Sequence, residues 1–235
     1  MNLRDIVIKS AWAMFNTVAR ILGNGESKHA DQDVNELIFE EVFAHIQPKA
    51  GERILDIGCG SGFLVERFAT GGSFAVGIDY INRFPTQNRG AYIQGDARKL
   101  PFADESFNHI ICFGVLHYLG DSVVIKSVLD EYIRVLKPKG KLFLGEVIQK
   151  RGYFNQYIKS SRMPPLKKVL LLCYLNSFLY QYYHIEHDRW LQMLASLPAS
   201  SLPISQRPDM PYNANMKHFV ITKNMGSCCA RIQAS

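Results

Sequence analysis

A short apolar segment that runs into a glycine-rich turn is the part of the sequence best suited to ligand chemistry. The segment spans residues 54–62 and reads ILDIGCGSG, and an apolar helical pattern follows it. Glycines let the backbone approach a ligand closely, and such a turn directs the amino terminus of the next helix toward that ligand. The pattern predicts a strand, a ligand-binding turn and a helix, with a plain tight turn as the alternative.

The spacing of the glycines distinguishes between ligands. A dinucleotide fingerprint, G-x-G-x-x-G, would need a third glycine at residue 63, but Phe63 stands there and the third glycine is Gly62. No Gly-Lys-Ser or Gly-Lys-Thr follows, as a P-loop would require. The sequence therefore disfavours a pyrophosphate site.

Two aspartates follow the next two apolar runs. Asp79 ends the second predicted strand, 17 residues after Gly62, and Asp96 follows the third strand. A carboxylate at the carboxyl edge of a parallel sheet can accept hydrogen bonds from both hydroxyl groups of a ribose. Either aspartate alone could be a strand-end cap, but the two together after the glycine turn favour a nucleoside site.

Short apolar runs that alternate with helical patterns would position these residues. Continuous apolar strands separated by helices are typical of a parallel sheet that is covered on both faces. The order of the strands does not follow from this pattern. The expected strands are residues 53–57, 73–78, 91–94, 107–113, 141–147 and 218–222, and the expected helices are 3–22, 33–46, 63–69, 123–136 and 188–197.

Charge is distributed unevenly along the 235 residues, whose net charge is +6. Residues 1–120 hold 11 Lys or Arg and 14 Asp or Glu, whereas residues 121–235 hold 16 and 7. Segment 137–168 alone has nine basic residues and one acid, Glu146. The hydrophobic fraction of 47% excludes a disordered or collagen-like chain.

Cysteines and apolar segments bear on the compartment. The spacing of the five cysteines matches neither a disulfide framework nor a zinc site, so we expect no bound metal. Lys9 interrupts the first apolar stretch, and no signal peptide is predicted. The most apolar run, 169–183, is shorter than the roughly 20 residues that span a bilayer. These features predict a reducing, cytoplasmic location.

Taken in order, the motifs resemble those of the class I S-adenosylmethionine-dependent methyltransferases, and the sequence looks like the branch that includes the ubiquinone and menaquinone methyltransferases. The resemblance extends from about Asp33 to Lys223. The segments that carry it read LDIGCGSG, GIDY, GDARKLPFADESF, CFGVLHYL and LKPKGKLFLGE. It implies an α/β, three-layer Rossmann-like fold with a mostly parallel seven-stranded sheet, an antiparallel last strand and a helical lid inserted after the fifth strand.

The resemblance also divides the chain. Residues 1–32 would form an N-terminal helix and linker that cap the domain, and residues 33–223 would form the methyltransferase domain. The lid would occupy about 148–186, and residues 224–235 would be a disordered tail.

The family implies S-adenosylmethionine as the cofactor and gives roles to the residues of the site. Asp79 would bind the ribose and Asp96 the adenine amino group, while Asp56 and the glycine turn would hold the methionine end. The expected cofactor-binding residues are Asp56, Gly58, Cys59, Gly60, Gly62, Asp79, Tyr80, Asp96, Ala97, Phe113 and Gly114. Three positions depart from the family pattern. Asn108 follows Phe107 where the family usually has an aromatic residue followed by Asp, Lys139 replaces the second glycine of the common K-P-G-G turn, and Gly114 stands where relatives often have a small polar residue.

The segment after the fourth strand bears on the acceptor. It reads CFGVLHY over 112–118, which lacks both the N-P-P-Tyr type of amino-methylating enzymes and the Pro-Cys pair of cytosine-C5 enzymes. The aromatic, Leu-rich lid suggests a small hydrophobic or planar acceptor, methylated on oxygen or carbon. Its basic residues suggest an anionic group on the acceptor or a peripheral membrane contact, with a solvated basic face as the alternative.

Histidines are the candidate catalytic bases. His117 follows the fourth strand, where it would be either a structural or cofactor-shell residue or a general base. His187, together with His184, is a second candidate, with a surface position as the alternative.

Two other functions remain open on the sequence alone. The basic cluster would suit an RNA methyltransferase, although no separate RNA-binding module is visible. A non-catalytic S-adenosylmethionine-binding protein is the other alternative, and the intact glycines, Asp79 and Asp96 argue against loss of the cofactor.

Overall fold

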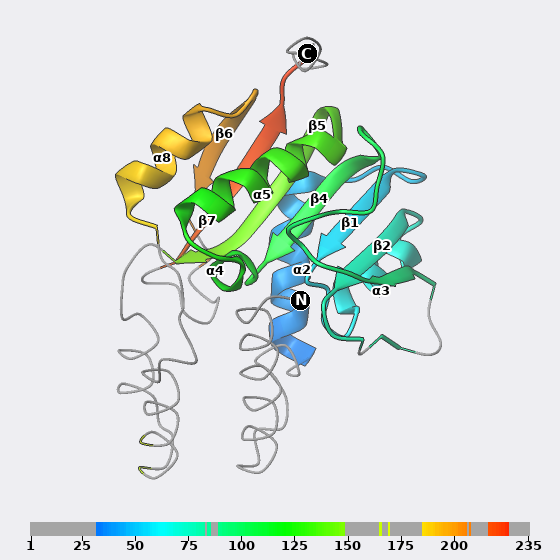
Figure 1. The fold of residues 1–235 in the computed structure, drawn as a ribbon. Coiled ribbons are helices and arrows are strands. Elements are labelled where there is room, and N and C mark those ends of the chain that lie inside the picture. Colours follow the sequence, from blue (N-terminus) through cyan, green and yellow to red (C-terminus); the bar gives the residue numbers. More distant parts are fainter. Residues whose placement is uncertain are drawn as a thin grey trace.

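A computed structural model describes residues 32–82, 84–85, 89–148, 165, 169, 185–205, 207 and 216–225. These parts form a seven-stranded sheet with helices on both faces (Figure 1). The strands are β1 (Arg53–Ile57), β2 (Phe74–Asp79), β3 (Ala91–Gln94), β4 (Phe107–Phe113), β5 (Leu136–Ile148), β6 (Ala199–Ile204) and β7 (Met216–Lys223). The helices are α2 (Gln32–Ile46), α3 (Phe63–Thr70), α4 (Leu116–Leu119), α5 (Ser122–Val135) and α8 (His187–Ala195).

The strand order in the sheet is β3-β2-β1-β4-β5-β7-β6. The five strands from β3 to β5 pair in parallel, whereas β7 is antiparallel to both β5 and β6. The expected mostly parallel sheet with an antiparallel last strand is therefore confirmed. The order reverses between β1 and β4, and in doubly wound sheets ligands bind at the carboxyl ends of the strands beside such a reversal.

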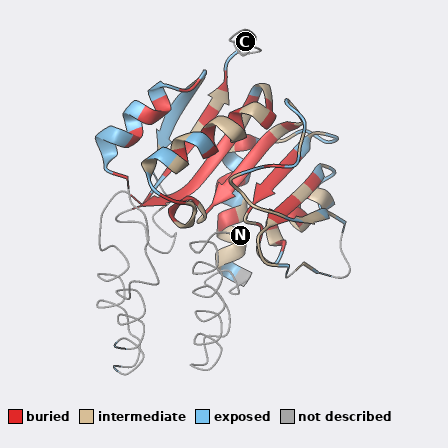
Figure 2. Ribbon diagram, viewed as in Figure 1, coloured by how far each residue is buried: buried red, intermediate tan, exposed pale blue. Residues whose placement is uncertain are grey.

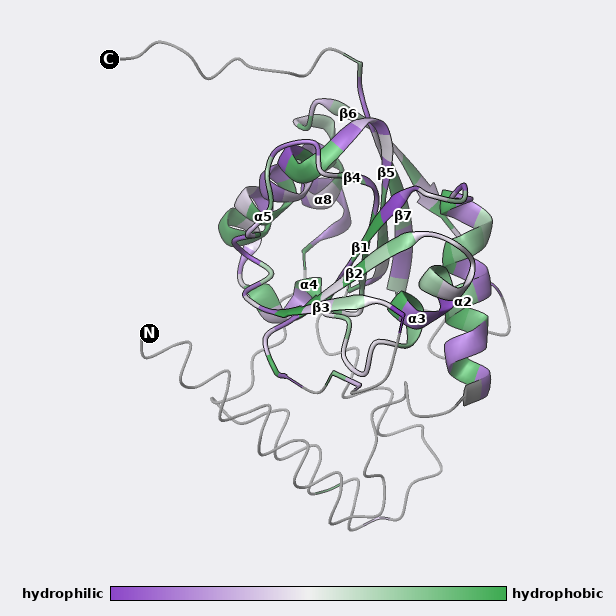
Figure 3. Cartoon of the chain, turned by 90° about the vertical axis from the view of Figure 1, so that its right-hand side faces the viewer, coloured by the Kyte–Doolittle hydropathy of each residue, from purple (hydrophilic) through white to green (hydrophobic). Residues whose placement is uncertain are grey.

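Two apolar clusters hold the helices against the sheet, which is the most deeply buried layer (Figure 2). The α2-side cluster packs α2 and α3 on one face, through residues such as Val42 and Phe68. The α5-side cluster packs α5 and α8 on the other face, through residues such as Tyr132 and Trp190. Figure 3 shows the two helical layers on opposite sides of the sheet.

Local sequence explains how the main helices begin and end. In α2, Ile38, Val42 and Ile46 recur every four residues and are buried, as expected for one face of a helix. The α5 helix begins at Asp121, whose side chain accepts hydrogen bonds from the amides of Val123 and Val124.

Several bounds differ from the sequence predictions. The fifth strand begins at Leu136, before the predicted residue 141, because the turn at 137–140 is accommodated by an irregularity in the pairing with β4. Strand β6 was not predicted, since most of its residues are exposed and Pro203 interrupts its pattern. The single-turn helix α4 was also missed. The helix expected at 3–22 lies outside the described residues, and no helix within the described ranges is long and apolar enough to cross a membrane.

Candidate functional site

Most of the predicted site residues gather at one edge of the sheet. Because β1, β2, β3 and β4 run in parallel, their carboxyl ends lie along the same edge. Figure 1 shows this edge on the side of the sheet where α4 lies. It holds the turn after β1, Asp79 at the end of β2, Asp96 after β3 and Gly114 after β4.

The three glycines of the turn all adopt left-handed backbone conformations, which favour glycine. Their φ angles are 74°, 56° and 83° at Gly58, Gly60 and Gly62. A Cβ atom added at Gly58 would collide with Val115, and one added at Gly62 would collide with Tyr92, whereas one added at Gly60 would meet no atom of the described residues within 4 Å. Packing therefore requires glycine at the first and third positions, while Gly60 presents its backbone to open space.

Several amides of the turn are already bonded within the protein. The amides of Gly58 and Cys59 both donate to the carbonyl of Ile78, at 2.7 and 3.3 Å, and the amide of Gly62 donates to the carbonyl of Cys59 at 2.8 Å. The Cys59 side chain is buried against Gly77, since its Sγ lies 2.6 Å from a Cβ built there. These bonds fix the turn against β2. We therefore expect the turn to contribute to ligand binding by letting a ligand approach the backbone closely at Gly60.

Two backbone amides hold the carboxylate of Asp79. Its Oδ2 accepts from the amide of Gly60 at 2.8 Å, and its Oδ1 accepts from the amide of Ile81 at 2.9 Å. Each oxygen of an ionised carboxylate has capacity for another hydrogen bond. Asp79 is thus oriented by the protein and can still accept hydrogen bonds from a diol such as ribose.

Asp56 is a buried carboxylate beneath the same turn. Only 5% of the residue is exposed, and burial, followed by the charge of Asp79, raises its pKa to about 7. A buried carboxylate favours a cation nearby, because the cation offsets the loss of hydration. Asp56 therefore suits the ammonium group of a ligand that enters over the turn.

Asp96 forms an ion pair with Arg98. The Arg98 Nε lies 3.0 Å from both carboxylate oxygens, and its Nη2 lies 2.6 Å from Oδ2. The Asp96 side chain is 34% exposed and so remains accessible, while Ala97 packs against the α5-side cluster. The carboxylate expected to receive the adenine amino group is therefore oriented by the guanidinium of Arg98, a contact that the motif spacing does not indicate.

The remaining predicted cofactor residues differ in where they point. The Phe113 ring stacks on Phe143, with ring centroids 6.4 Å apart, and meets His218 edge-on at 5.5 Å. It therefore contributes to the α2-side cluster. Tyr80 follows β2, and its carbonyl accepts a hydrogen bond from the Gln94 side chain at 3.1 Å.

The two predicted catalytic histidines lie in different surroundings. His117 is buried in α4, directly after β4, and its ring centroid is 4.0 Å from that of Tyr118. His187 is exposed at the first residue of α8. His184 lies outside the described residues. A role as base stays a prediction for each of them.

Glu146 is a candidate functional residue that the sequence analysis missed. It lies near the end of β5, is 3% exposed and has a φ angle of 54°, a conformation that costs a non-glycine residue about 1–3 kcal/mol. The apolar run that ends in Gly145-Glu146 at the carboxyl end of a strand was the signal that could have revealed it. No sequence pattern indicates the left-handed backbone.

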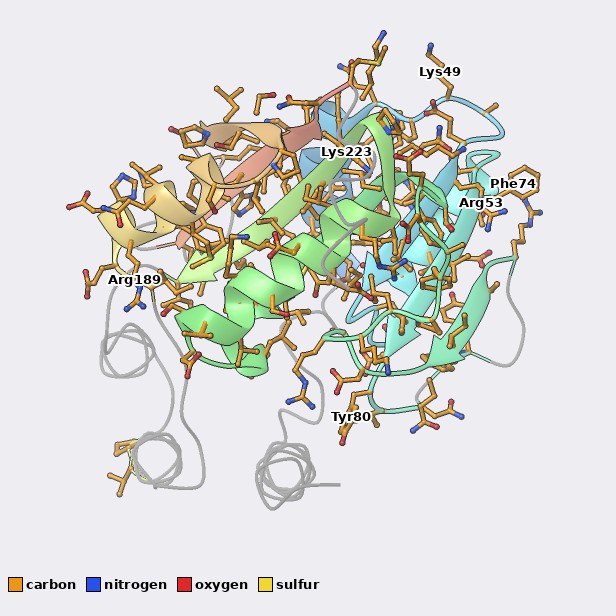
Figure 4. All side chains as sticks on the ribbon, turned by 45° about the horizontal axis from the view of Figure 1, so that its top comes forward. Lys49, Arg53, Phe74, Tyr80, Arg189 and Lys223 are labelled. Carbon is orange, nitrogen blue, oxygen red and sulfur yellow. The ribbon has the colours of Figure 1, made fainter. Side chains whose placement is uncertain are left out.

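Part of the basic cluster lies at the opposite end of the sheet from this site. Lys137 donates to Asn108 at 3.2 Å, and Lys141 donates to the carbonyls of His45 and Ile46 at 2.8 and 3.3 Å, at the end of α2. Figure 4 shows Lys49 and Arg53 at that end and Tyr80 at the other. Lys137 and Lys141 thus have local structural roles, Lys139 is exposed, and the basic residues from 150 to 168 fall outside the described residues. Within the described ranges, no group of three or more His, Cys, Asp or Glu is placed to hold a metal ion.

The strand order, with the glycine turn at the point of reversal, defines a doubly wound α/β domain, a fold whose ligands bind at the carboxyl ends of the strands beside the reversal. Residues 55–144 match the family described as "Methyltransferase domain". This part of the chain is therefore a methyltransferase domain, and the resemblance to class I S-adenosylmethionine-dependent methyltransferases is confirmed for it.

Curated relatives and solved structures agree with this assignment. The chain is 32% identical over 160 residues to a demethylmenaquinone methyltransferase of Clavibacter sepedonicus, covering 62% of each protein. It is 33% identical over 112 residues to the 27-O-demethylrifamycin SV methyltransferase of Amycolatopsis mediterranei, covering 43% of this chain and 40% of that protein. The fold matches Burkholderia thailandensis 1,6-didemethyltoxoflavin-N1-methyltransferase, solved with bound 1,6-didemethyltoxoflavin and S-adenosylhomocysteine. The TM-score is 0.64 at 14% identity, and the match covers 94% of this chain and 89% of that one.

The extent of these matches limits what is shared. The matched regions span about two fifths to three fifths of the length of the two curated relatives. The solved structure supports the fold alone, because its sequence identity is low. Activity and acceptor are therefore taken up as proposals.

Proposed function

We propose that this protein is an S-adenosylmethionine-dependent methyltransferase that acts on a small, hydrophobic or planar organic acceptor, at oxygen or carbon. The observation that carries the proposal is the hydrogen bond between the Gly60 amide and Asp79, which joins the turn after β1 to the carboxylate after β2. The turn follows β1, which borders the reversal of strand order, and Asp79 ends the neighbouring strand β2, so that both lie at the edge where a nucleoside ligand would bind.

The residues at the carboxyl edge of the sheet suit different parts of this cofactor, one strand after another. Asp79 offers acceptors for the ribose hydroxyls, and Asp96 offers an accessible carboxylate for the adenine amino group. Asp56 supplies a buried negative charge for the ammonium of the methionine end. The open space above Gly60 allows the close approach that this end requires.

When bound, the cofactor supplies an electrophilic methyl group on a sulfonium. The protein then has to hold a nucleophilic atom in line with that methyl group, and such positioning can provide a large part of the rate. A base is needed only where the acceptor atom carries a proton.

Support for a small acceptor comes from the relatives and the sequence. The names of both curated relatives specify small organic acceptors, one of them an oxygen. The expected lid at 148–186 is aromatic and Leu-rich, although most of it lies outside the described residues. A reducing, cytoplasmic location is part of the proposal, and it is supported by the buried side chains of Cys59 and Cys112, neither of which is in a disulfide.

Isothermal titration of the full chain with S-adenosylmethionine and S-adenosylhomocysteine tests the cofactor assignment. We expect micromolar binding of both compounds, weakened in Asp79→Ala but retained in Asp130→Ala, whose aspartate pairs with Lys126 on α5. No binding by the wild-type chain would contradict the proposal.

Transfer of a labelled methyl group distinguishes the acceptor classes. The chain is incubated with labelled S-adenosylmethionine and either an organic-solvent extract of cells or total RNA. Label in extractable small molecules supports the proposal, and label in RNA would identify an RNA methyltransferase instead. Cofactor binding with no transfer to either fraction would favour a non-catalytic binding protein.

A further inference from the structure

Glu146 is a buried carboxylate at the carboxyl end of β5, one strand beyond the proposed cofactor edge. Along β5 and β7 the paired residues advance from Leu144 opposite Phe219 to Val147 opposite Lys217. Three steps on β5 therefore match two on β7, which defines a bulge that contains Gly145 and Glu146. Bulges re-aim side chains and occur often beside active sites.

Neighbouring glycines make room for this arrangement. A Cβ added at Gly114 would lie only 3.1 Å from Oε2 of Glu146, and one added at Gly145 would collide with the Phe113 ring. The amide of Gly114 donates to the carbonyl of Gly145 at 3.1 Å, which ties the end of β4 to the bulge. The Glu146 carboxylate is thus held over the end of β4, where a side chain at residue 114 would otherwise lie.

The strand order gives this carboxylate a position relative to the cofactor. Asp96 and Asp79 follow β3 and β2, and they would hold the adenosine. The turn after β1 would hold the methionine end, next to β4. The methyl group would then lie toward β4 and β5, and Glu146 lies near the end of β5. A side chain kept in a left-handed backbone conformation at such an edge points to a functional constraint.

We propose that the Glu146 carboxylate is the base that receives the proton of an acceptor hydroxyl, so that the acceptor is a phenol or enol methylated on that oxygen. The inference rests on the proposed function. In the step, the hydroxyl proton moves to Glu146 and the oxygen forms a bond to the methyl carbon. The bond between sulfur and the methyl carbon breaks, and its electron pair stays on sulfur to give S-adenosylhomocysteine.

Three hydroxylated probes test this assignment: demethylmenaquinol, 1-naphthol and 4-nitrophenol. We expect wild-type protein to convert at least one of them to its methyl ether. Glu146→Gln should lower kcat for that probe by about 10²–10⁴-fold, the range for loss of a general base, and should bind S-adenosylhomocysteine as tightly as wild type. Glu146→Asp should fall between the two, because it retains a proton acceptor but moves it.

The matched control is Glu105→Gln. Glu105 also has a left-handed φ angle, 55°, but it pairs with Lys223 at 3.1 Å in another part of the chain. Its variant should keep the wild-type kcat. Thermal melting of each variant separates loss of the base from loss of folding, and Glu146→Asp gives a second, milder change should Glu146→Gln fold poorly.

A binding measurement provides a readout that does not depend on turnover. The absorbance of 4-nitrophenol changes when its hydroxyl ionises, near neutral pH. In the presence of S-adenosylhomocysteine, the wild type should bind the neutral form, because the hydroxyl donates to a negative carboxylate. Glu146→Gln, which lacks that charge, should bind the ionised form at least as well as the neutral one.

Each other outcome has a definite meaning. Wild-type kcat in a folded Glu146→Gln protein would overturn the assignment, and so would the same bound form of 4-nitrophenol in both proteins. If none of the three probes is bound or methylated by a chain that binds S-adenosylhomocysteine, the assignment fails while the proposed function stands. If the wild type does not bind S-adenosylhomocysteine, both fail.

Discussion

The amide nitrogen of Gly60 lies 2.8 Å from Oδ2 of Asp79, and this contact joins two segments that the sequence separates by 19 residues. It fixes the direction of the carboxylate before any ligand binds. It also keeps the turn after β1 in contact with the end of β2. The two elements of the proposed cofactor site are therefore preorganised as a unit.

Replacing Asp79 should affect cofactor binding more than stability. Asp79→Ala removes the ribose acceptor and the partner of the Gly60 amide, so we expect the Kd for S-adenosylmethionine to rise by about 10–100-fold, since hydrogen bonds to a charged group contribute about 1.5–3 kcal/mol. Titration calorimetry measures this change. An unchanged Kd would show that the ligand does not contact Asp79.

The glycines of the turn should separate packing from binding. Gly60→Ala introduces a methyl group into open space at a left-handed φ angle, which costs about 1–2 kcal/mol of stability. We expect it to fold and to bind S-adenosylmethionine at least about tenfold more weakly, because each 1.4 kcal/mol of lost contact corresponds to a factor of ten.

Gly58→Ala is the matched comparison. Its methyl group would collide with Val115, so we expect a larger fall in the melting temperature than for Gly60→Ala. Thermal melts of both variants, with and without cofactor, check the pair. Equal stability of the two would contradict the packing described for the turn.

Burial of Asp56 should make stability depend on pH. Its pKa is about 7 in the folded chain and 3.8 as the reference value, so the folded state retains a proton that the unfolded state has lost between these values. The free energy of unfolding should then fall as pH rises from about 4 to about 7. Asp56→Asn should remove this dependence and be more stable above pH 7, by an amount on the order of 4 kcal/mol.

The same carboxylate should make cofactor affinity rise with pH. An ammonium group pairs with ionised Asp56 and not with its protonated form, so the Kd for S-adenosylmethionine should decrease between pH 6 and pH 8. Titration of Asp56→Asn should show weaker binding with no such trend. A parallel trend in both proteins would assign the effect to another group.

Lys139 should be replaceable by glycine with a gain in stability. Its φ angle is 62° and its side chain is exposed. Lys139→Gly relieves the left-handed strain, and after the added entropy of the unfolded chain we expect about 0.5–1 kcal/mol of stabilisation. Lys139→Ala keeps the strain and serves as the control in denaturant melts. A gain in the alanine variant would point to charge instead of backbone conformation.

We expect Lys141 to stabilise the fold and to take no part in binding the acceptor. Its Nζ caps two carbonyls at the end of α2, so Lys141→Met should lower stability by about 1–2 kcal/mol while leaving cofactor affinity unchanged. Within the described residues the Lys139 side chain donates no such hydrogen bond, so Lys139→Met provides the comparison in the same melts. Weakened cofactor binding in a folded Lys141→Met protein would contradict this assignment.

Much of the fold could be predicted because periodicity and strand ends are local properties. Residues 53–57 and 107–113 form strands with the predicted bounds, as their continuous apolar runs indicated. Strand β6 was missed because it lies at an edge and pairs through its backbone while most of its side chains remain exposed. Its position depends on β7, and no pattern within its own six residues indicates that pairing.

The site shows the same division between local and tertiary information. The glycine spacing and the position of Asp79 after a predicted strand indicated that the turn and Asp79 lie at the carboxyl edge. The structure joins them there by the hydrogen bond from the Gly60 amide to Asp79. The orientation of Phe113 toward the α2-side cluster depends on contacts with β5 and β7. The pairing of Asp96 with Arg98 depends on rotamers, so neither could be derived from spacing.

The bulge in β5 determines which face of the sheet each side chain after Leu144 occupies. Side chains along a strand alternate between faces, yet Leu142, Leu144 and Val147 all belong to the α5-side cluster. The extra residue restores the apolar face after Leu144; in a regular strand, Glu146 would share the face of Leu144, within the apolar cluster. Deletion of Gly145 would place Val147 two residues after Leu144, the spacing at which a regular strand keeps side chains on one face. The apolar face would then continue without a bulge, while Glu146 would directly follow Leu144 on the opposite face, so that such a deletion should redirect Glu146 more than it disturbs the packing of β5.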